Sequence, residues 1–500
     1  MKQLKELFSD TLIYGLSHVF TRFVGYLLVP FYTGVFDTDE YGIISLIYVL
    51  MAFLNVIFTF GMESTYFRYA KDRHKAKDIF KTIQLTLLAT TICLLTIVWL
   101  LNPILNPVIG LVKPFPLFTL MLGILAFDTL SAVPFAELRL AQKPFHFAFI
   151  KMANAFINIG LNFYLVLKIN LSIEAVLISN IVASIITAFI VWYITFDMMK
   201  GVWDGAFLKK AIKFGLPFVP AGIGYVINEM IDRFFLKKMD SETITEIYGL
   251  ASGGSVYNGE DVVGIYSAGY KLAVVMLLFV TVFRYAWQPF FMRQSDQKEA
   301  PKIFSETFRY FNFGAAAIFI IFSLFASDIV QIKIPFTEAT LIGREYWLGL
   351  SIVSPLLMAY WFQGWYINFS AGIFIGEKTK VLAYITLIGS VITITGNMLF
   401  VPHFGMLASA YTTLVSYAVM AFIIYYHSKK AFDVPYKIWQ GILVLLIADL
   451  TTFSQPYLKN AIESGIWASA ILCITGIGLI GILTKKNFFQ SNNSVKHLNS

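Results

Sequence analysis

Three charged side chains stand at the end of one apolar segment. The stretch "NEMIDRFFLKK", residues 228–238, follows a long apolar run and carries Glu229, Asp232 and Arg233. A charge exposed to lipid acyl chains costs between about 2.5 and more than 10 kcal/mol. We therefore expect these residues to line a protein interior or a wet cavity. Two alternatives are a simple pairing of Glu229 with Arg233 along the helix and an anchor at the membrane interface.

Two cations lie deeper in other apolar segments, near the expected midplane of a bilayer. Arg22 is about ten residues from the start of the first segment, roughly 15 Å along a helix, and Lys271 is at a similar depth in the eighth. Arginine binds phosphate through two parallel hydrogen bonds, and lysine acts as a point charge. The pair indicates an anionic ligand, with neutralisation of Asp128 or Asp232 by Arg22 as the structural alternative.

The other polar candidates share a position inside apolar segments, where we expect them to line a cavity. They are His18, Asn55, Asp128, Asn228, Glu229, Asp232 and Arg233. For His18 the alternative is a packed polar residue of the core. No catalytic motif accompanies them, because the six histidines are scattered and the signatures of phosphate loops, serine hydrolases and zinc peptidases do not occur. We expect no enzyme activity, no cofactor and no metal site.

The amino-acid composition indicates which kind of secondary structure positions these residues. Of the 500 residues, 58% are hydrophobic and 14% are charged, where a soluble chain has about 25% charged residues. The chain is therefore expected to be an all-α polytopic membrane protein. The net charge of +8 does not indicate nucleic acid, because the cations lie in short loops between apolar runs. Cys93 and Cys473 lie within such runs, so we expect neither a disulfide framework nor a Cys/His metal cluster.

A helix needs roughly 20 apolar residues to cross the hydrocarbon core, and this criterion predicts about fourteen spans. They cover residues 12–35, 42–63, 82–102, 116–136, 147–167, 174–196, 208–236, 262–283, 308–326, 346–368, 380–401, 406–427, 437–456 and 464–484. The first has no small-residue cleavage site after it, so we interpret it as a retained helix and not a signal peptide. Glycine and proline residues in 208–236 predict a bend there.

The loops give the expected orientation. With both ends in the cytoplasm, most loop lysines and arginines fall on the inner side, as the positive-inside rule requires. The few outer cations are Lys113, Lys168, Lys237, Lys238, Lys333, Arg344 and Lys459. The loop at 239–261 reads as an acidic, Gly/Ser-containing outer insertion.

An internal repeat organises the spans. "YGIISLIYVL" at 41–50 is similar to "VGIYSAGYKL" at 263–272, with Gly42 matching Gly264. Matches such as Asn162 with Asn397 continue the relation later in the chain. We expect two six-helix lobes related by a pseudo-two-fold axis along the membrane normal, because six spans return the chain to the same side. The predicted divisions are 1–200, 201–430 and a pair of additional helices with the tail at 431–500.

Four stretches carry a resemblance to a known family. They are "YGIISLIYVLMAFLNVIFTFGMESTYFRYA" (41–70), "INEMIDRFFL" (227–236), "VGIYSAGYKL" (263–272) and "GNMLFVPHFGMLASAYTTLVSY" (396–417). The chain resembles the polysaccharide transporter (Wzx-like) family of the multidrug/oligosaccharidyl-lipid/polysaccharide exporter superfamily. The resemblance extends over essentially the whole chain, and its motifs are diffuse.

The resemblance implies a bacterial inner-membrane flippase with two lobes that open alternately to each side. Its substrate would be a polyprenyl-diphosphate-linked oligosaccharide used for surface polysaccharide, and its partners would be membrane lipids and other polysaccharide-assembly proteins. Related lipid II flippases use cations that Arg22 and Lys271 match in position. Asp128 is a looser match for a coupling carboxylate, and the second span lacks a central arginine, which leaves the diphosphate site incomplete. The alternatives are a cation-coupled multidrug exporter of the same fold and a membrane polysaccharide polymerase.

The first prediction concerns topology. Cysteines introduced at Ser252 and Asn493 should react with a membrane-impermeant thiol reagent from opposite sides, Ser252 from the outside, because an odd number of predicted spans separates them. Labelling in intact cells compared with inverted vesicles measures this. Reaction of both cysteines from the same side would contradict the predicted span count.

Overall fold

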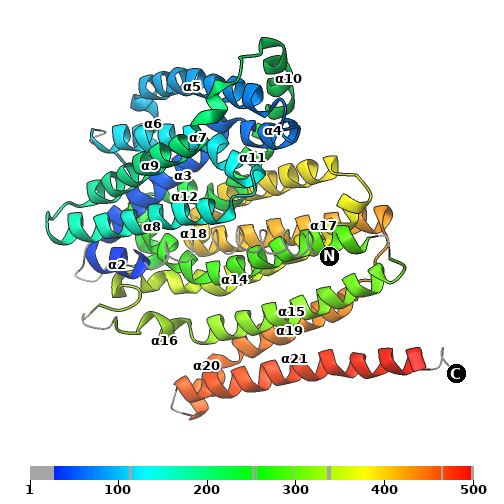
Figure 1. Ribbon diagram of the computed structural model, residues 1–500. Helices are drawn as coiled ribbons and strands as arrows, with labels where there is room; N and C mark the ends of the chain where they lie inside the picture. Colours follow the sequence, from blue (N-terminus) through cyan, green and yellow to red (C-terminus); the bar gives the residue numbers. More distant parts are fainter. Residues whose placement is uncertain are drawn as a thin grey trace. The chain divides into compact units, whose positions relative to one another are not determined.

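A computed structural model describes the backbone of residues 28–496, apart from short stretches at 112–114, 250–253, 255, 296, 335–338 and 463–464. Within this range the chain is helical, and the one β feature is a lone bridge between Lys333 and Thr340 (Figure 1). The predicted all-α fold is confirmed. Two of the predicted site residues, His18 and Arg22, lie outside the described residues.

The chain packs as two compact units. Unit 1 comprises residues 1–267 and 393–405, and unit 2 comprises 268–392 and 406–500. Two long helices contribute to both units, so the division falls inside helices. The lobe boundaries expected from the repeat, at 200 and 430, stay a prediction.

The helices of unit 1 are mostly long and apolar, with short helices at their ends. They are α2 (Leu28–Val35), α3 (Thr38–Thr59), α4 (Met62–Tyr69), α5 (Ala76–Leu100), α6 (Asn102–Val108), α7 (Leu117–Leu140), α8 (Pro144–Leu167), α9 (Ile173–Thr195), η1 (Phe196–Lys200), α10 (Gly205–Gly215), α11 (Phe218–Met230), α12 (Asp232–Lys237) and α13 (Ser241–Tyr248). Helix α9 packs against both α7 and α8, and the three run side by side (Figure 1). This trio forms the framework of the cavity described below.

Unit 2 contains the longest helices. They are α14 (Gly259–Gln294, whose first residues belong to unit 1), α15 (Ala300–Leu324), α16 (Ala326–Val330), η2 (Arg344–Ile352), α17 (Val353–Ile375), α18 (Lys380–Ala431, with 393–405 in unit 1), α19 (Ile438–Phe453), α20 (Gln455–Ile462) and α21 (Gly465–Lys496). Helices α15, α19 and α21 pack against one another (Figure 1). Inside the unit, the Asn312 side-chain oxygen accepts hydrogen bonds from the indole nitrogens of Trp361 (2.9 Å) and Trp365 (2.7 Å).

Among the described residues, 11 helices are long and apolar enough to cross a membrane. One of them, α18, holds two predicted spans, 380–401 and 406–427, separated by a kink at Gly405, whose φ is 54°. The predicted span 346–368 corresponds to η2 and the 23-residue α17. The predicted total of fourteen stays a prediction, because most of the first span lies outside the described residues.

One span and one loop region were expected to be irregular. The segment 208–236 is broken into α10, α11 and α12, in agreement with the bend that its glycines and prolines predict. The region 239–261, however, is not entirely a loop, because α13 forms within it. Asp240 caps this helix by accepting a hydrogen bond from the Thr243 amide (2.9 Å), and an Asp that precedes a short helical segment is a strong start signal.

The repeat-related glycines meet each other where α3 crosses the first residues of α14. A methyl group on Gly42 would overlap the Glu260 carbonyl and lie 3.1 Å from the Gly264 amide nitrogen. A methyl group on Gly264 would overlap the Thr38 carbonyl and lie 3.0 Å from the Gly42 amide nitrogen. Thr38 and Glu260 each lie four residues before the glycine of their own helix. The two backbones therefore touch, and only glycine fits at either position.

The second prediction follows from this contact. Gly42→Val should greatly reduce the folded protein recovered from membranes, since backbone on the facing helix cannot move aside as a side chain can; overpacking costs at least about 1–3 kcal/mol. Gly160→Val on α8 is the matched control, because nothing lies within 4 Å of its added carbon. Membrane blots and size-exclusion profiles compare the two variants. Equal recovery of both would contradict the close crossing.

Candidate functional site

A polar cavity of about 420 Å³ lies within unit 1, among helices that the bilayer would surround. Its walls come from α3, α4, α7, α8 and α9. The lining residues are Asn55, Thr59, Glu63, Asp128, Ser131, Ala132, Phe135, Arg139, Phe147, Lys151, Asn154, Asn180, Ser184 and Thr187. Most of them are polar, which is opposite to what a lipid-facing surface carries.

Each of three neighbouring helices supplies one polar face. On α7 the face begins at Asp128 and continues through Ser131 to Arg139, and on α8 it runs from Lys151 to Asn154. On α9 it contains Asn180, Ser184 and Thr187. The spacings are three or four residues on α8 and α9, and three and then eight on α7, which place the side chains of each helix on one side. The cavity therefore forms where three largely apolar helices turn a few polar side chains toward a common space.

Opposite charges stand in the cavity without an ion pair between them. The Asp128 carboxylate accepts a hydrogen bond from the Ser184 hydroxyl at 2.8 Å. The Lys151 ammonium lies 4.2 Å from the centre of the Phe135 ring. The ion pairs within 4.0 Å among the described residues do not join Asp128 to Lys151. Both charged side chains line the cavity.

A second charged pair closes one end of the cavity. Arg139 near the end of α7 pairs with Glu63 at the start of α4, and its guanidinium lies 4.6 Å from the centre of the Phe67 ring. Next to it, Arg73 binds Glu137 through two contacts, at 2.5 and 2.9 Å, and Tyr66 donates to the same carboxylate at 2.6 Å. The hydrogen bond with Glu137 raises the pKa of the Arg73 guanidinium, in the loop before α5, above its ordinary value. These contacts fix α4 and the following loop onto α7.

Hydrogen bonds between side chains hold the cavity wall. The Asn154 amide donates to the Thr187 hydroxyl at 2.9 Å, which joins α8 to α9. The Asn180 amide donates to the Tyr48 hydroxyl at 2.9 Å, which joins α9 to α3. Such bonds keep polar groups satisfied at membrane depth and preserve the shape of the cavity.

The charged residues of 228–238 form a separate cluster in unit 1. Asn228, Glu229, Asp232 and Arg233 are only 3–6% exposed. Arg233 donates to Asp232 (2.8 Å) and to the Glu229 carbonyl (2.8 Å), and the Tyr266 hydroxyl also donates to Asp232. The cluster is therefore buried within unit 1, and the cavity-lining role of these residues stays a prediction.

The structure places the predicted site residues in different regions. It brings Asn55 and Asp128 to the unit 1 cavity and gathers 228–233 in the second cluster. Lys271 is half-buried on α14, in unit 2. The expected joint binding of an anionic substrate by Arg22 and Lys271 stays a prediction, because Arg22 lies outside the described residues.

Sequence reasoning missed Lys151, the cation deepest in the described cavity. Its signal was present, because Lys151, Asn154, Asn158 and Asn162 recur every three or four residues along one face of an otherwise apolar segment. Of these, Asn162 is fully buried and accepts a hydrogen bond from the Tyr32 hydroxyl at 3.0 Å. Among the described residues, His, Cys, Asp and Glu side chains form no group of three that could hold a metal ion.

Comparison with known families decides the classification. The profile of the family described as "Polysaccharide biosynthesis protein" matches residues 7–295, which is more than half of the chain. The chain belongs to this family. A search of curated proteins finds no match.

Solved structures of similar fold come from two groups of transporters. The lipid II flippase MurJ in an inward closed conformation has a TM-score of 0.70 and 15% identity, covering 96% of this chain and 99% of its own. An inward-facing multidrug-resistance MATE family transporter of the MOP superfamily has a TM-score of 0.61 and 12% identity, with 84% and 94% covered. A Vibrio cholerae MATE transporter, VcmN, has a TM-score of 0.58 and 12% identity, with 85% and 96% covered. This member of the polysaccharide biosynthesis family is therefore a multi-pass membrane protein with the MOP transporter fold, and the predicted superfamily is confirmed.

The third prediction tests whether the cavity contains water. With Cys93 and Cys473 replaced by serine, a cysteine at Asn154 should react at least about tenfold faster with a small charged thiol reagent than one at Phe149. Both positions are on α8, but Asn154 lines the cavity whereas Phe149 is 71% exposed on the outer side of the helix bundle. A thiol in apolar surroundings stays protonated and meets no charged reagent. Labelling in lipid nanodiscs, where both faces are accessible, measures the rates; equal rates would contradict a wet cavity.

Proposed function

We propose that this protein is a flippase that moves a polyprenyl-diphosphate-linked oligosaccharide from the cytoplasmic to the outer leaflet for surface polysaccharide assembly. The observation that carries the proposal is the polar, charged cavity inside a unit of apolar helices. The family match supports the connection with polysaccharide. A hydrophilic glycan needs a polar path across the hydrocarbon core, whereas its lipid tail is soluble in the bilayer.

The cavity offers suitable chemistry for a glycan carried on a phosphate. Amide and hydroxyl side chains such as Asn154, Asn180 and Thr187 can exchange hydrogen bonds with sugar hydroxyls. Lys151 supplies a positive charge for a phosphate oxygen, and its carboxylate neighbour Asp128 accepts hydrogen bonds from hydroxyls. The cations expected at Arg22 and Lys271 would add to the anion-binding capacity, with Asp128 as the candidate for coupling to an ion.

Transport would proceed by alternating access, in which the substrate site faces each side of the membrane in turn. The interrupted helix of α10, α11 and α12 is the element of unit 1 best suited to bend, because prolines and glycines such as Pro217, Pro220 and Gly222 lie within it. The bias of loop cations supports termini in the cytoplasm and residence in a bacterial inner membrane. The partners would be membrane lipids and other polysaccharide-assembly proteins.

A cation-coupled multidrug exporter is the second candidate. Asp128, a carboxylate within the cavity, and the likeness of the fold to MATE transporters favour it. An exporter of cationic drugs would be inhibited by positive charge at Lys151, whereas a flippase for a diphosphate lipid would need that charge. The same variant therefore separates the two functions.

The fourth prediction is a transport measurement. In proteoliposomes containing a fluorescent lipid-linked oligosaccharide, the wild type should expose the label to a membrane-impermeant quencher faster than empty liposomes. Lys151→Gln should slow this by roughly tenfold to 150-fold, because one charge-assisted contact contributes about 1.5–3 kcal/mol. Lys143→Gln is the matched control: the same change at an exposed position just before α8, outside the cavity lining.

Arg22→Ala and Lys271→Ala extend the test to the predicted midplane cations. Each should abolish or severely reduce flipping, Arg22→Lys should retain part of it, and the double variant should be no worse than the poorer single one if both bind one diphosphate. Near-normal flipping by Lys151→Gln and by both alanine variants would contradict an anionic substrate. Faster efflux of a cationic dye by Lys151→Gln would favour the drug exporter.

A further inference from the structure

A second pocket, in unit 2, has a composition that the proposed flipping does not explain. It is enclosed by α15, α19 and α21 and has a volume of about 140 Å³. Its lining residues are Ser305, Phe308, Arg309, Asn312, Lys437, Gln440, Gly441, Leu443, Val444, Leu483 and Thr484. All of them belong to unit 2.

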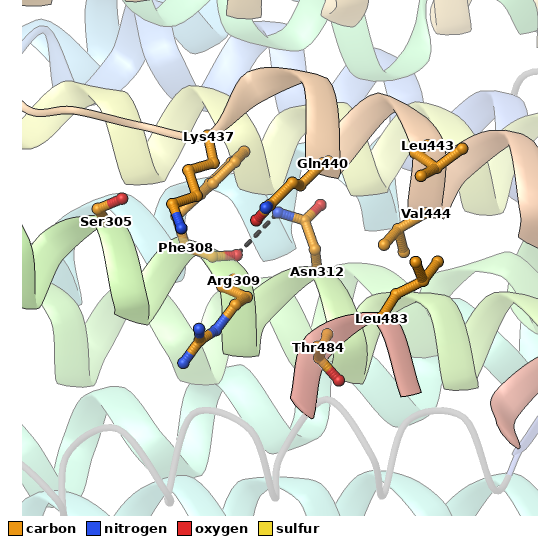
Figure 2. A pocket seen from close by; sticks show the side chains of 11 residues that line it. Ser305, Phe308, Arg309, Asn312, Lys437, Gln440, Leu443, Val444, Leu483 and Thr484 are labelled. Carbon is orange, nitrogen blue, oxygen red and sulfur yellow. Dashed lines mark hydrogen bonds between the residues drawn. The ribbon is translucent and has the colours of Figure 1, made fainter. Parts of the chain in front are cut away.

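Polar and apolar groups separate within this pocket. Arg309, Lys437 and Gln440 lie at one end, and Leu443, Val444 and Leu483 lie at the other (Figure 2). A ligand that fits must therefore have an anionic, hydrogen-bonding part joined to an apolar part. This is the arrangement of a phospholipid near its glycerol backbone.

The two cations have no carboxylate partner. Neither Arg309 nor Lys437 takes part in an ion pair within 4.0 Å among the described residues, although Glu306 lies one turn before Arg309 on α15. The Nε atom of Arg309 is buried, and within the described part of the chain it has no hydrogen-bond acceptor. Two cations without an ion pair around one small pocket attract an anion. The buried Nε–H of Arg309 can donate a directional hydrogen bond to that anion.

The pocket lies near the ends of the apolar segments that form it. Helices α15 and α19 begin near it, with Lys437 immediately before α19, and the apolar run of the α21 sequence ends beside it at Thr484, before Lys485 and Lys486. The positive-inside interpretation assigns these ends to the cytoplasmic side. Outward from the pocket, α19 exposes Trp439 (80%) and Leu446 (53%), which are suited to contact with the membrane.

We propose that this pocket binds the phosphodiester headgroup of an anionic glycerophospholipid from the adjacent leaflet. Arg309 and Lys437 contact the phosphate, Gln440 and Ser305 supply further hydrogen bonds, and Leu443, Val444 and Leu483 pack against the first methylene groups of the acyl chains. Basic pockets between transmembrane helices at a cytoplasmic surface bind lipid headgroups in this manner. The pocket has one third of the volume of the unit 1 cavity, so it suits a phosphate and glycerol and has no space for an oligosaccharide.

The bound lipid would connect the last two long helices to the body of unit 2. Because Arg309 comes from α15, Lys437 and Gln440 from the start of α19, and Thr484 from α21, one headgroup contacts all three helices. A ligand that binds only the folded state raises its stability in proportion to the logarithm of its concentration. Lipid binding is thus measurable as thermal stabilisation, independently of any transport.

The fifth prediction uses full-length protein purified in a neutral detergent. Phosphatidylglycerol should raise the melting temperature of the wild type in a concentration-dependent manner, and phosphatidylcholine should not. Native mass spectrometry from mixed micelles should show phosphatidylglycerol retained on the protein. Arg309→Gln/Lys437→Gln should weaken the retention at least about tenfold, since each charge-assisted contact accounts for about one order of magnitude.

The matched control is Lys298→Gln/Lys302→Gln. It removes the same number of charges from exposed positions near the start of α15 and should leave retention unchanged. If the pocket double variant does not give monodisperse protein, Lys437→Gln alone serves, because Lys437 is exposed. Arg309→Lys should keep part of the binding.

Three outcomes would overturn the proposal. Equal retention of phosphatidylglycerol by the pocket variant and the control variant would mean that Arg309 and Lys437 do not bind the lipid and are simply solvated at the membrane interface. Displacement of the lipid by excess inorganic phosphate would indicate a site for free phosphate. Stronger retention of a polyprenyl phosphate than of phosphatidylglycerol would assign the pocket to a polyprenyl carrier lipid.

Discussion

Lipid acyl chains accept no hydrogen bonds, so every polar group at membrane depth must find its partner in protein or enclosed water. Most polar groups in both units obey this constraint through specific pairs. Asn312 joins two tryptophans of α17 through one oxygen, and Asp232 is held by Arg233 and Tyr266. The charges that make no ion pair within the described part of the chain are therefore informative. Asp128 and Lys151 in unit 1 and the cations of the small pocket in unit 2 are where a ligand can add to the contacts.

The two sites differ in which charged groups line them. The unit 1 cavity contains both acids and bases, together with amides and hydroxyls, which suits a large polar molecule that must bind and leave again. The unit 2 pocket contains cations and no carboxylate among its lining residues, and Leu443, Val444 and Leu483 make part of its wall aliphatic. An exclusively cationic pocket holds an anion more tightly than a mixed one, because no neighbouring acid competes for the cations. Transient binding in one unit and durable binding in the other are consistent with a substrate and a structural lipid.

Much of the fold could be predicted from single segments of sequence. The lengths of apolar runs predict most of the spans, and Gly405 divides the 52-residue α18 into the two that were expected. The residues Asn55 and Asp128 were identified because a polar group in an apolar run is conspicuous by itself. The cavity could not be predicted in this way, because Lys151, Ser184 and Arg139 meet only through the packing of α7, α8 and α9. The helix α13 was missed because a loop-like composition concealed its Asp240 cap.

The contact between Gly42 and Gly264 has a symmetry of its own. Each glycine meets the backbone of the other helix four residues before the other glycine, so the same surface is used on both sides. A contact of this kind is isologous, as in a two-fold symmetric dimer. The two helices that make it are the ones whose sequences repeat. Had the two copies been separate polypeptides, this one surface would have allowed them to associate with each other. This pair of glycines thus has the geometry of a homodimer interface within one polypeptide.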